Sequence, residues 1–461
     1  MIDTFKQPNG FYRNVFALMI PIILQNIITQ TVTLADTFMV GVLGEQSLAA
    51  VTLAATPMFV FTIFTFGVQS GAGILVSQYW GKGNTSAINR VLGVGLYFSI
   101  IITFGAAVIL SSFPQQILNL VTSEKSLVGL GVPYARITGF ATACNAISMI
   151  YISCQRSMEN PRLGVIVLSI SALFNVFGNW VLIFGKFGFP ALGIEGAAIA
   201  TLCSRIIEVI IIAIYAMRNS KLPIKIMLLL KPGFTIFRDF VKYSIPVLVN
   251  EGLWGLGAML YPVIFGHMAG AGSILASYNI AGNLERLFAV ATFASGAATA
   301  VIIGREIGAG RREHIISVAK SLMALGLLLG LASCAILMVA RFTVLVPIVF
   351  PLFDLSKEAT SNATIMLTIL ACITPVRTLA FTMGIGILRG GGDVKALMYI
   401  DVGSLYFVGI PMAAITGLIL KADIGVVYSS LLLEDAIKLV FLYFRVRSKK
   451  WINDVTREQL E

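Results

Sequence analysis

The sequence has few charged residues for its length. Asp, Glu, Lys and Arg make up 12% of the 461 residues, whereas soluble proteins carry about 25%. A soluble chain of this size could not cover its surface with so little charge. Histidine is also scarce, because only His267 and His314 occur. They lie in predicted loops and far apart, so we expect no histidine metal centre.

Cysteine is present in an arrangement that excludes the usual cysteine chemistry. None of the five shows CxxC spacing, and all lie in apolar stretches. We interpret them as small packing residues and expect neither a disulfide nor a metal site. They are Cys144, Cys154, Cys203, Cys334 and Cys372.

Long apolar runs take up most of the chain. Hydrophobic residues reach 57% and the mean hydropathy is +0.90, which indicates an all-α integral membrane protein. A span needs about 20 apolar residues, and about twelve runs are long enough. The first run is too long for a signal peptide, so we expect none to be cleaved. The runs lie near 15–40, 48–79, 91–112, 132–154, 163–184, 194–217, 241–266, 272–304, 317–340, 361–388, 396–419 and 424–445.

Lys and Arg are distributed unevenly among the predicted loops. Of the 33, 23 fall in one alternating set of loops, six in the other set and four within the apolar runs. The positive-inside rule then predicts an even number of spans in the plasma membrane, with both termini cytoplasmic. This topology accounts for the net charge of +11 without any nucleic acid partner.

The second half of the chain repeats the first. Pro21 and Pro246 are 225 positions apart, as are Gly41 and Gly266. Six spans per repeat make the halves parallel, an arrangement in which transporters place substrate between two rocking halves. We therefore predict two pseudo-symmetric six-helix lobes, residues 1–217 and 241–461. The basic linker 218–240 between them is predicted to lie on anionic lipid headgroups.

Several motifs resemble the multidrug and toxic compound extrusion family over nearly the whole chain. Asp36 follows Pro21 by 15 positions, and "ADTFMVG", "GKGN" and "RGGGDVK" stand at helix ends; the C-terminal stretch resembles a bacterial branch. The resemblance implies twelve helices in two lobes and export of organic cations driven by inward H⁺ or Na⁺. It implies a bending or hinge role for Pro21 and coupling roles for Asp36, Asn175 and Thr201. Asn179 stands where many relatives have a second carboxylate.

Asp36 is the only ionisable residue between Arg13 and Glu45. An Asp in mid-membrane costs about 2.5–3.5 kcal/mol, so we expect it to face a cavity or a partner. A proton or a bound cation can neutralise it, and a cationic substrate can compete for the same place.

Asn175 and Asn179 share a helix face and, with Asp36 and Thr201, could surround a small ion. The alternative is that Asp36 makes a structural hydrogen bond and that the amides pair across helix interfaces.

The second half has its own intramembrane acids. Glu251 and Asp401 lie within apolar runs, and the rings of Trp254 and Tyr261 follow Glu251, a combination that suits organic cations. The alternative is that both acids form buried ion pairs with Arg377 or Lys438.

Three further charged pairs favour structural roles. The spacing predicts ion pairs of Glu434 with Lys438 and of Arg205 with Glu208, and pairing of Glu285 or Arg286 with other helices.

The favoured function is a secondary antiporter that exports amphipathic cations, with H⁺ or Na⁺ as coupling ion, no cofactor or metal, and a monomeric chain. A lipid-linked or oligosaccharide flippase of the same architecture is the alternative, although it would want a cationic cleft and the spans offer little beyond Arg377. An intramembrane enzyme would need a His-based centre, and the spans contain no His/Glu or Ser/His pair. A channel does not need a duplicated rocking architecture.

Overall fold

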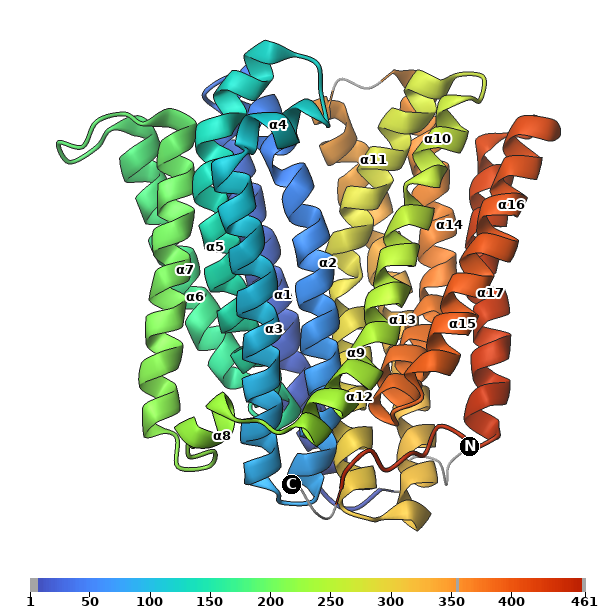
Figure 1. Ribbon diagram of the computed structural model, residues 1–461. Coiled ribbons are helices and arrows are strands. Elements are labelled where there is room, and N and C mark those ends of the chain that lie inside the picture. The colour runs from blue at the N-terminus through green and yellow to red at the C-terminus, as the bar shows by residue number, and fades with distance from the viewer. Residues whose placement is uncertain (1–6, 354–355, 458–461) are drawn as a thin grey trace. The chain divides into compact units, whose positions relative to one another are not determined.

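The computed structural model describes residues 7–353 and 356–457, and its regular structure there is entirely helical (Figure 1). The α-helices are α1 (Phe11–Gly41), α2 (Glu45–Gly81), α3 (Thr85–Ser112), α4 (Pro114–Asn119), α5 (Lys125–Ser157), α6 (Arg162–Phe184), α7 (Gly193–Arg218), α8 (Ile226–Leu230), α9 (Phe234–Ala258), α10 (Leu260–Gly266), α11 (Ala271–Phe288), α12 (Val290–Gly308), α13 (Arg312–Ala340), α14 (Lys357–Phe381), α15 (Val394–Ser404), α16 (Ile410–Ala414) and α17 (Ile424–Arg447). Short π or 3₁₀ segments continue several of them: η2 (Arg341–Val349), η3 (Phe350–Phe353), η4 (Thr382–Arg389), η5 (Leu405–Gly409) and η6 (Ile415–Ile419).

The all-α membrane fold predicted from the apolar runs is confirmed. Among the described residues, 11 helical segments are long and apolar enough to cross a bilayer. The predicted twelfth span is α17, which carries Glu434, Asp435 and Lys438 in its middle and is too charged to be counted by composition. The long run 272–304 is divided at Ala289 into α11 and α12.

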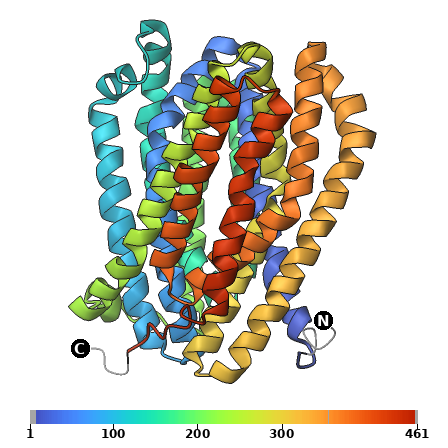
Figure 2. The same ribbon diagram turned by 90° about the vertical axis from the view of Figure 1, so that its right-hand side faces the viewer.

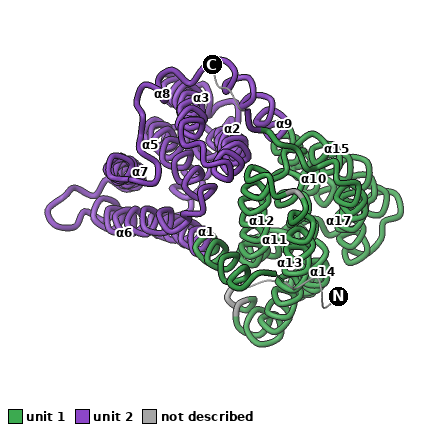
Figure 3. Tube along the Cα trace, turned by 90° about the horizontal axis from the view of Figure 1, so that it is seen from below, with its two compact units in different colours: residues 1–23, 249–455 green, residues 24–248, 456–461 purple. Residues whose placement is uncertain are grey.

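The chain forms two compact units, and two of the three points where it passes from one to the other fall inside helices (Figure 3). Unit 1 comprises residues 1–23 and 249–455, and unit 2 comprises residues 24–248 and 456–461. These two divisions lie two residues beyond a proline within a helix, Pro21 in α1 and Pro246 in α9, and the third follows Val455 in the stretch after α17. The predicted lobes 1–217 and 241–461 are stretches of sequence and stay a prediction; the compact units divide the chain at different points.

Packing explains why α1 is divided. Val15, Leu18, Met19 and Ile22 are buried in the core of unit 1 with residues of α12 and α13. The second half of α1 contributes instead to unit 2, where Val40 packs with Ile183 of α6. The hinge role of Pro21 is a prediction that this division supports without testing.

Unit 2 contains α2, α3 and α5 in mutual contact, with α7 on α5 and α6 on α7. The first half of α9 joins this unit, and Phe240 stacks on Phe98 of α3 with ring centroids 5.6 Å apart. Gly67 and Gly71 of α2 lie directly against Leu248 and Ser244 of α9. Small residues permit this close approach of helices, as is usual inside membranes.

Unit 1 is built around α12, α13 and α14, and α17 packs on α14. The segments α15 and α16 run beside α17 (Figure 2). Below them, Trp451 after α17 is among the largest fully buried side chains, and it covers Gly391 in the turn after η4.

The polar stretch "TQTVTLADT" in α1 satisfies most of its hydroxyls within the helix. Thr29, Thr33 and Thr37 each donate to the carbonyl four residues earlier, over 2.9, 3.0 and 2.8 Å. This is the usual local bond of Thr in helices. The Asp36 carboxylate has no proton of its own to donate in this way when ionised, and its partner Asn179 lies on another helix.

The close approach at Gly71 predicts a specific loss of stability. A Cβ at Gly71 would overlap Ser244, including its backbone, so Gly71→Ala should destabilise unit 2 by about 1–3 kcal/mol through overpacking. Thermal unfolding of the detergent-solubilised chain measures this. Gly105→Ala on α3 is the control, because nothing lies within 4 Å of a Cβ there; an equal or larger loss at Gly105 would contradict the packing argument.

Candidate functional site

The four residues predicted to couple ions are joined by hydrogen bonds within unit 2. Asn179 Nδ2 on α6 donates to Asp36 Oδ1 on α1 at 2.5 Å. The same nitrogen donates to Asn175 Oδ1 at 3.4 Å, and Asn175 Nδ2 donates to Thr201 Oγ1 on α7 at 3.3 Å. The structure therefore brings together all four residues that the sequence singled out.

Burial makes this chain of bonds energetically significant. Asn179 is 0% and Asn175 3% exposed, while Asp36 is half-buried. Asn179 Oδ1 is buried with no hydrogen-bond partner in the described part of the chain. Because a buried polar atom without a partner is costly, the amide of Asn179 has an oxygen available to a bound ion or water.

A small polar cavity adjoins Asp36. Its volume is about 60 Å³, which is room for about two water molecules. Charged and polar side chains make up most of its wall, and four apolar residues complete it. The lining residues are Ile28, Thr29, Val32, Thr33, Asp36, Leu168, Ser171, Ala172, Asn175, Ser204, Arg205 and Glu208.

The predicted ion pair of Arg205 and Glu208 is confirmed. Arg205 Nη1 donates to Glu208 Oε1 at 2.5 Å, and the Glu208 side chain is fully buried. Both residues line the cavity beside Asp36. The sequence predicted their pairing but not their place next to Asp36, because spacing along α7 does not show what α1 presents to it.

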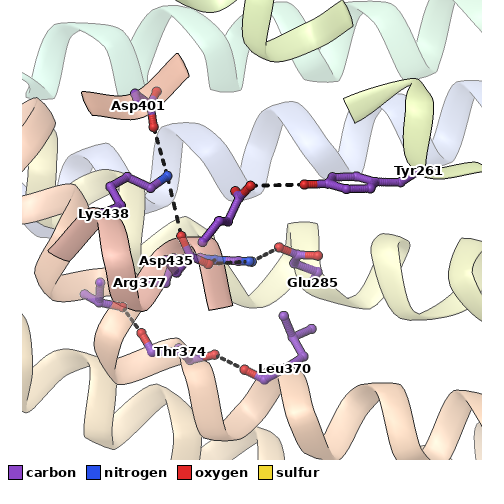
Figure 4. Close-up of polar contacts among 10 residues, drawn as sticks. Tyr261, Glu285, Leu370, Thr374, Arg377, Asp401, Asp435 and Lys438 are labelled. Atoms are coloured by element: carbon purple, nitrogen blue, oxygen red, sulfur yellow. Dashed lines mark hydrogen bonds and ion pairs between the residues drawn. The ribbon is translucent and has the colours of Figure 1, made fainter. Parts of the chain in front are cut away.

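Unit 1 contains a network of buried ion pairs (Figure 4). Arg377 of α14 contacts Glu285 of α11 and donates to Asp435 of α17 at 2.8 Å. Lys438 of α17 donates to Asp401 of α15 at 2.8 Å and lies 3.5 Å from Asp435. The predicted pairing of Glu285 with another helix is confirmed, as is the structural alternative for Asp401.

The predicted pair of Glu434 and Lys438 is wrong. Lys438 turns to Asp401 and Asp435, and Glu434 instead accepts a 3.0 Å hydrogen bond from Tyr261 of α10. Gly409 of η5 makes room for this bond, since a Cβ there would overlap the Glu434 carboxylate and the Tyr261 hydroxyl. Glu434 and Asp435 are adjacent in α17 and point to different partners, and it is Asp435, which also contacts Arg377, that lies next to Lys438.

Glu251 also has a partner that the sequence did not predict. Arg389, at the end of η4, donates to Glu251 Oε1 at 2.9 Å, and Asn250 donates to Asp401 at 3.1 Å. Trp254 is 47% exposed. The acids and rings proposed for a cation site thus have separate partners: Glu251 with Arg389, Asp401 with Lys438 and Tyr261 with Glu434.

Two of the missed residues left a signal in the sequence. Asp435 lies three positions before Lys438, a helical pairing distance, and it forms the centre of the network in Figure 4. Arg389 belongs to the repeated motif "RGGGDVK", but no spacing along the chain connects it to Glu251.

One family model matches both halves of the chain. The model, MatE, covers residues 21–181 and again residues 246–415. The chain belongs to the MatE family. The two matches begin at Pro21 and Pro246, which confirms the internal duplication, and the chain is a multi-pass membrane transporter of this multidrug and toxic compound extrusion family.

Relatives resemble the chain along its whole length. It is 23% identical to the "Uncharacterized transporter YisQ" of Bacillus subtilis, over 97% of this chain and 96% of that protein. It is 24% identical to the "Probable multidrug resistance protein NorM" of Thermotoga maritima, over 97% and 95%.

Among solved structures, a mutant of the Vibrio cholerae MATE transporter VcmN superposes with a TM-score of 0.83 at 18% identity, covering 98% of this chain and 100% of that one. A MATE crystal structure in the bent conformation reaches 0.84 at 18% identity, over 95% and 96%. These likenesses show the shared fold.

The ion-pair network predicts how unit 1 responds to loss of a base. Arg377→Gln should destabilise the chain by about 3–5 kcal/mol, because removing one partner leaves buried acids uncompensated. The double variant Arg377→Gln with Asp435→Asn should recover part of that loss. Chemical unfolding in detergent measures both; equal stability of the single variant and the parent would show that the network does not carry buried charge.

Proposed function

We propose that the protein is a secondary antiporter that exports amphipathic organic cations in exchange for inward H⁺ or Na⁺. One observation carries the proposal: Asp36 lies within an apolar helix, is bound by an amide rather than by a base, and opens onto a polar cavity. A carboxylate in that setting needs a positive charge from elsewhere.

The ion pairs of unit 1 support Asp36 as the coupling residue. Glu251 and Asp401 each have a basic partner within 2.9 Å, so their charges are already compensated. In the described residues Asp36 has no ion pair with Lys or Arg; its hydrogen bond comes from Asn179. Of these acids it is therefore the one whose charge an incoming cation or proton would balance.

Competition at this carboxylate gives antiport. A proton or Na⁺ bound at Asp36 removes the charge that attracts a cationic substrate, and a bound substrate removes the place for the ion. Asn175, Asn179 and Thr201 offer amide and hydroxyl oxygens, which suit a hard cation. A proton would need Asp36 alone.

The membrane potential sets the scale of transport. One charge moving through 100 mV supplies about 2.3 kcal/mol, and about 1.4 kcal/mol is a factor of ten. A single coupled ion therefore sustains roughly a 50-fold gradient of a neutral solute. Export of a cation requires a second coupled charge or an added chemical gradient.

The relatives named as multidrug resistance proteins support the substrate class. The loop distribution of Lys and Arg supports a plasma-membrane location with cytoplasmic termini. The flippase alternative predicts movement of labelled lipid between the leaflets of liposomes that contain the protein, without an ion gradient.

The test is dye efflux from proteoliposomes under an imposed proton gradient or an imposed sodium gradient, one at a time. Asp36→Asn should abolish ion-driven ethidium efflux while thermal unfolding stays close to that of the parent, because Asn keeps the size and can still bond to Asn179. Glu195→Gln, which removes an exposed carboxylate at the start of α7, is the matched control and should transport normally. Parental efflux by Asp36→Asn would refute the coupling role.

A further inference from the structure

Glu208 is a second carboxylate in the cavity beside Asp36. It lies on α7, is 0% exposed, and lines the same cavity as Asp36. One oxygen, Oε1, accepts from Arg205 at 2.5 Å. The other, Oε2, is buried and has no hydrogen-bond partner in the described residues.

An unsatisfied carboxylate oxygen at a cavity wall points to a ligand. Leaving such an atom buried without a partner costs free energy, and a cation or a water on a cation would remove that cost. The same cavity offers the hydroxyls of Ser171 and Ser204 and the amide of Asn175. These are oxygen ligands of the kind that small hard cations prefer.

The charge of the cavity follows from its lining. Asp36, Glu208 and Arg205 are the ionisable residues in its wall, so the sum is one negative charge when all three are ionised. From α5, Tyr134 lies near Asp36 and Cys144 lies near Glu208, and a phenol and a thiol are both uncharged at neutral pH. One monovalent cation or one proton would therefore make the cavity neutral.

We propose that Glu208 is the second acid of this ion site and that Arg205 is its resident counter-ion, which restricts the site to a single positive charge. The proposal rests on the coupling role of Asp36. It adds that the net charge of the cavity determines the valence of the ion that binds there. Helix α7 then supplies both the second acid and the base that balances it. Removal of Arg205 would leave two negative charges, and removal of Glu208 alone would leave none.

Four proteins test the charge count: the parent, Arg205→Met, Glu208→Gln, and the double variant. The full-length chain in detergent is titrated with NaCl or CaCl₂ at constant ionic strength, and the melting temperature reports binding, since an ion that binds the folded state raises it. The same titrations are repeated with proteins that also carry Asp36→Asn. A rise in melting temperature that persists there comes from ions bound elsewhere on the protein.

Arg205→Met should bind Ca²⁺ at least about tenfold more tightly than the parent, because loss of the Arg205 charge leaves the Asp36 and Glu208 carboxylates of the same cavity uncompensated in a medium of low dielectric constant. Glu208→Gln should lose its response to monovalent cations, since Arg205 is then free to neutralise Asp36. The double variant has the parental net charge and should recover the parental ion response.

The double variant keeps the test valid if Arg205→Met does not fold, because it removes both members of the Arg205–Glu208 ion pair and leaves Asp36 as the parent has it. A Ca²⁺ affinity of Arg205→Met within threefold of the parent would overturn the proposal. So would equal ion responses of Glu208→Gln and the double variant. If the Asp36→Asn variant still shows ion-driven ethidium efflux at the parental rate, the proposed function fails. If Asp36→Asn is inactive and the Ca²⁺ affinity is unchanged, only the role of Arg205 and Glu208 fails.

Discussion

The high cost of a charge in hydrocarbon governs the interior of this protein. A carboxylate buried in a bilayer must be paired, hydrogen-bonded or neutralised, and the two compact units meet this requirement differently. In unit 1, Asp401, Asp435 and Glu285 are held by Arg377 and Lys438. In unit 2, Asp36 is held by an amide. The first solution fixes charge permanently, and the second leaves a charge that a mobile ion can balance.

This difference changes how the duplication should be understood. The two halves match one family model and begin at equivalent prolines, yet their polar interiors have diverged. Unit 1 uses several of its acids for structure, since Glu285, Asp401 and Asp435 each contact a base (Figure 4). Unit 2 keeps a polar cavity lined by Asp36 and by Glu208, whose Oε2 is unsatisfied in the described residues, and the amide oxygen of Asn179, whose nitrogen donates to Asp36, is unsatisfied there as well. Fold and polar interior therefore differ: the repeat preserves the helices, and the ion coupling that we propose rests on side chains of one half.

The sequence predicted the fold well because membrane spans depend on length and hydropathy, which are local properties. It also predicted the joined set Asp36, Asn175, Asn179 and Thr201, through family resemblance and the helical spacing of the two amides. It failed for Glu434, because the choice of Lys438 among Asp401, Asp435 and Glu434 depends on three helices at once. It could not place Arg205 and Glu208 beside Asp36, or divide α1 at Pro21, since tertiary packing decides both.

The central claim is that the Asp36 carboxylate exchanges its neutralising charge during transport. Isotope-edited infrared spectroscopy of the chain labelled at Asp carboxyl carbons measures this directly, with Asp36→Asn used to assign the band. The account predicts that the Asp36 band changes when pH or Na⁺ concentration is varied and changes again when a cationic substrate is added. A band that stays the same under all three conditions would contradict it.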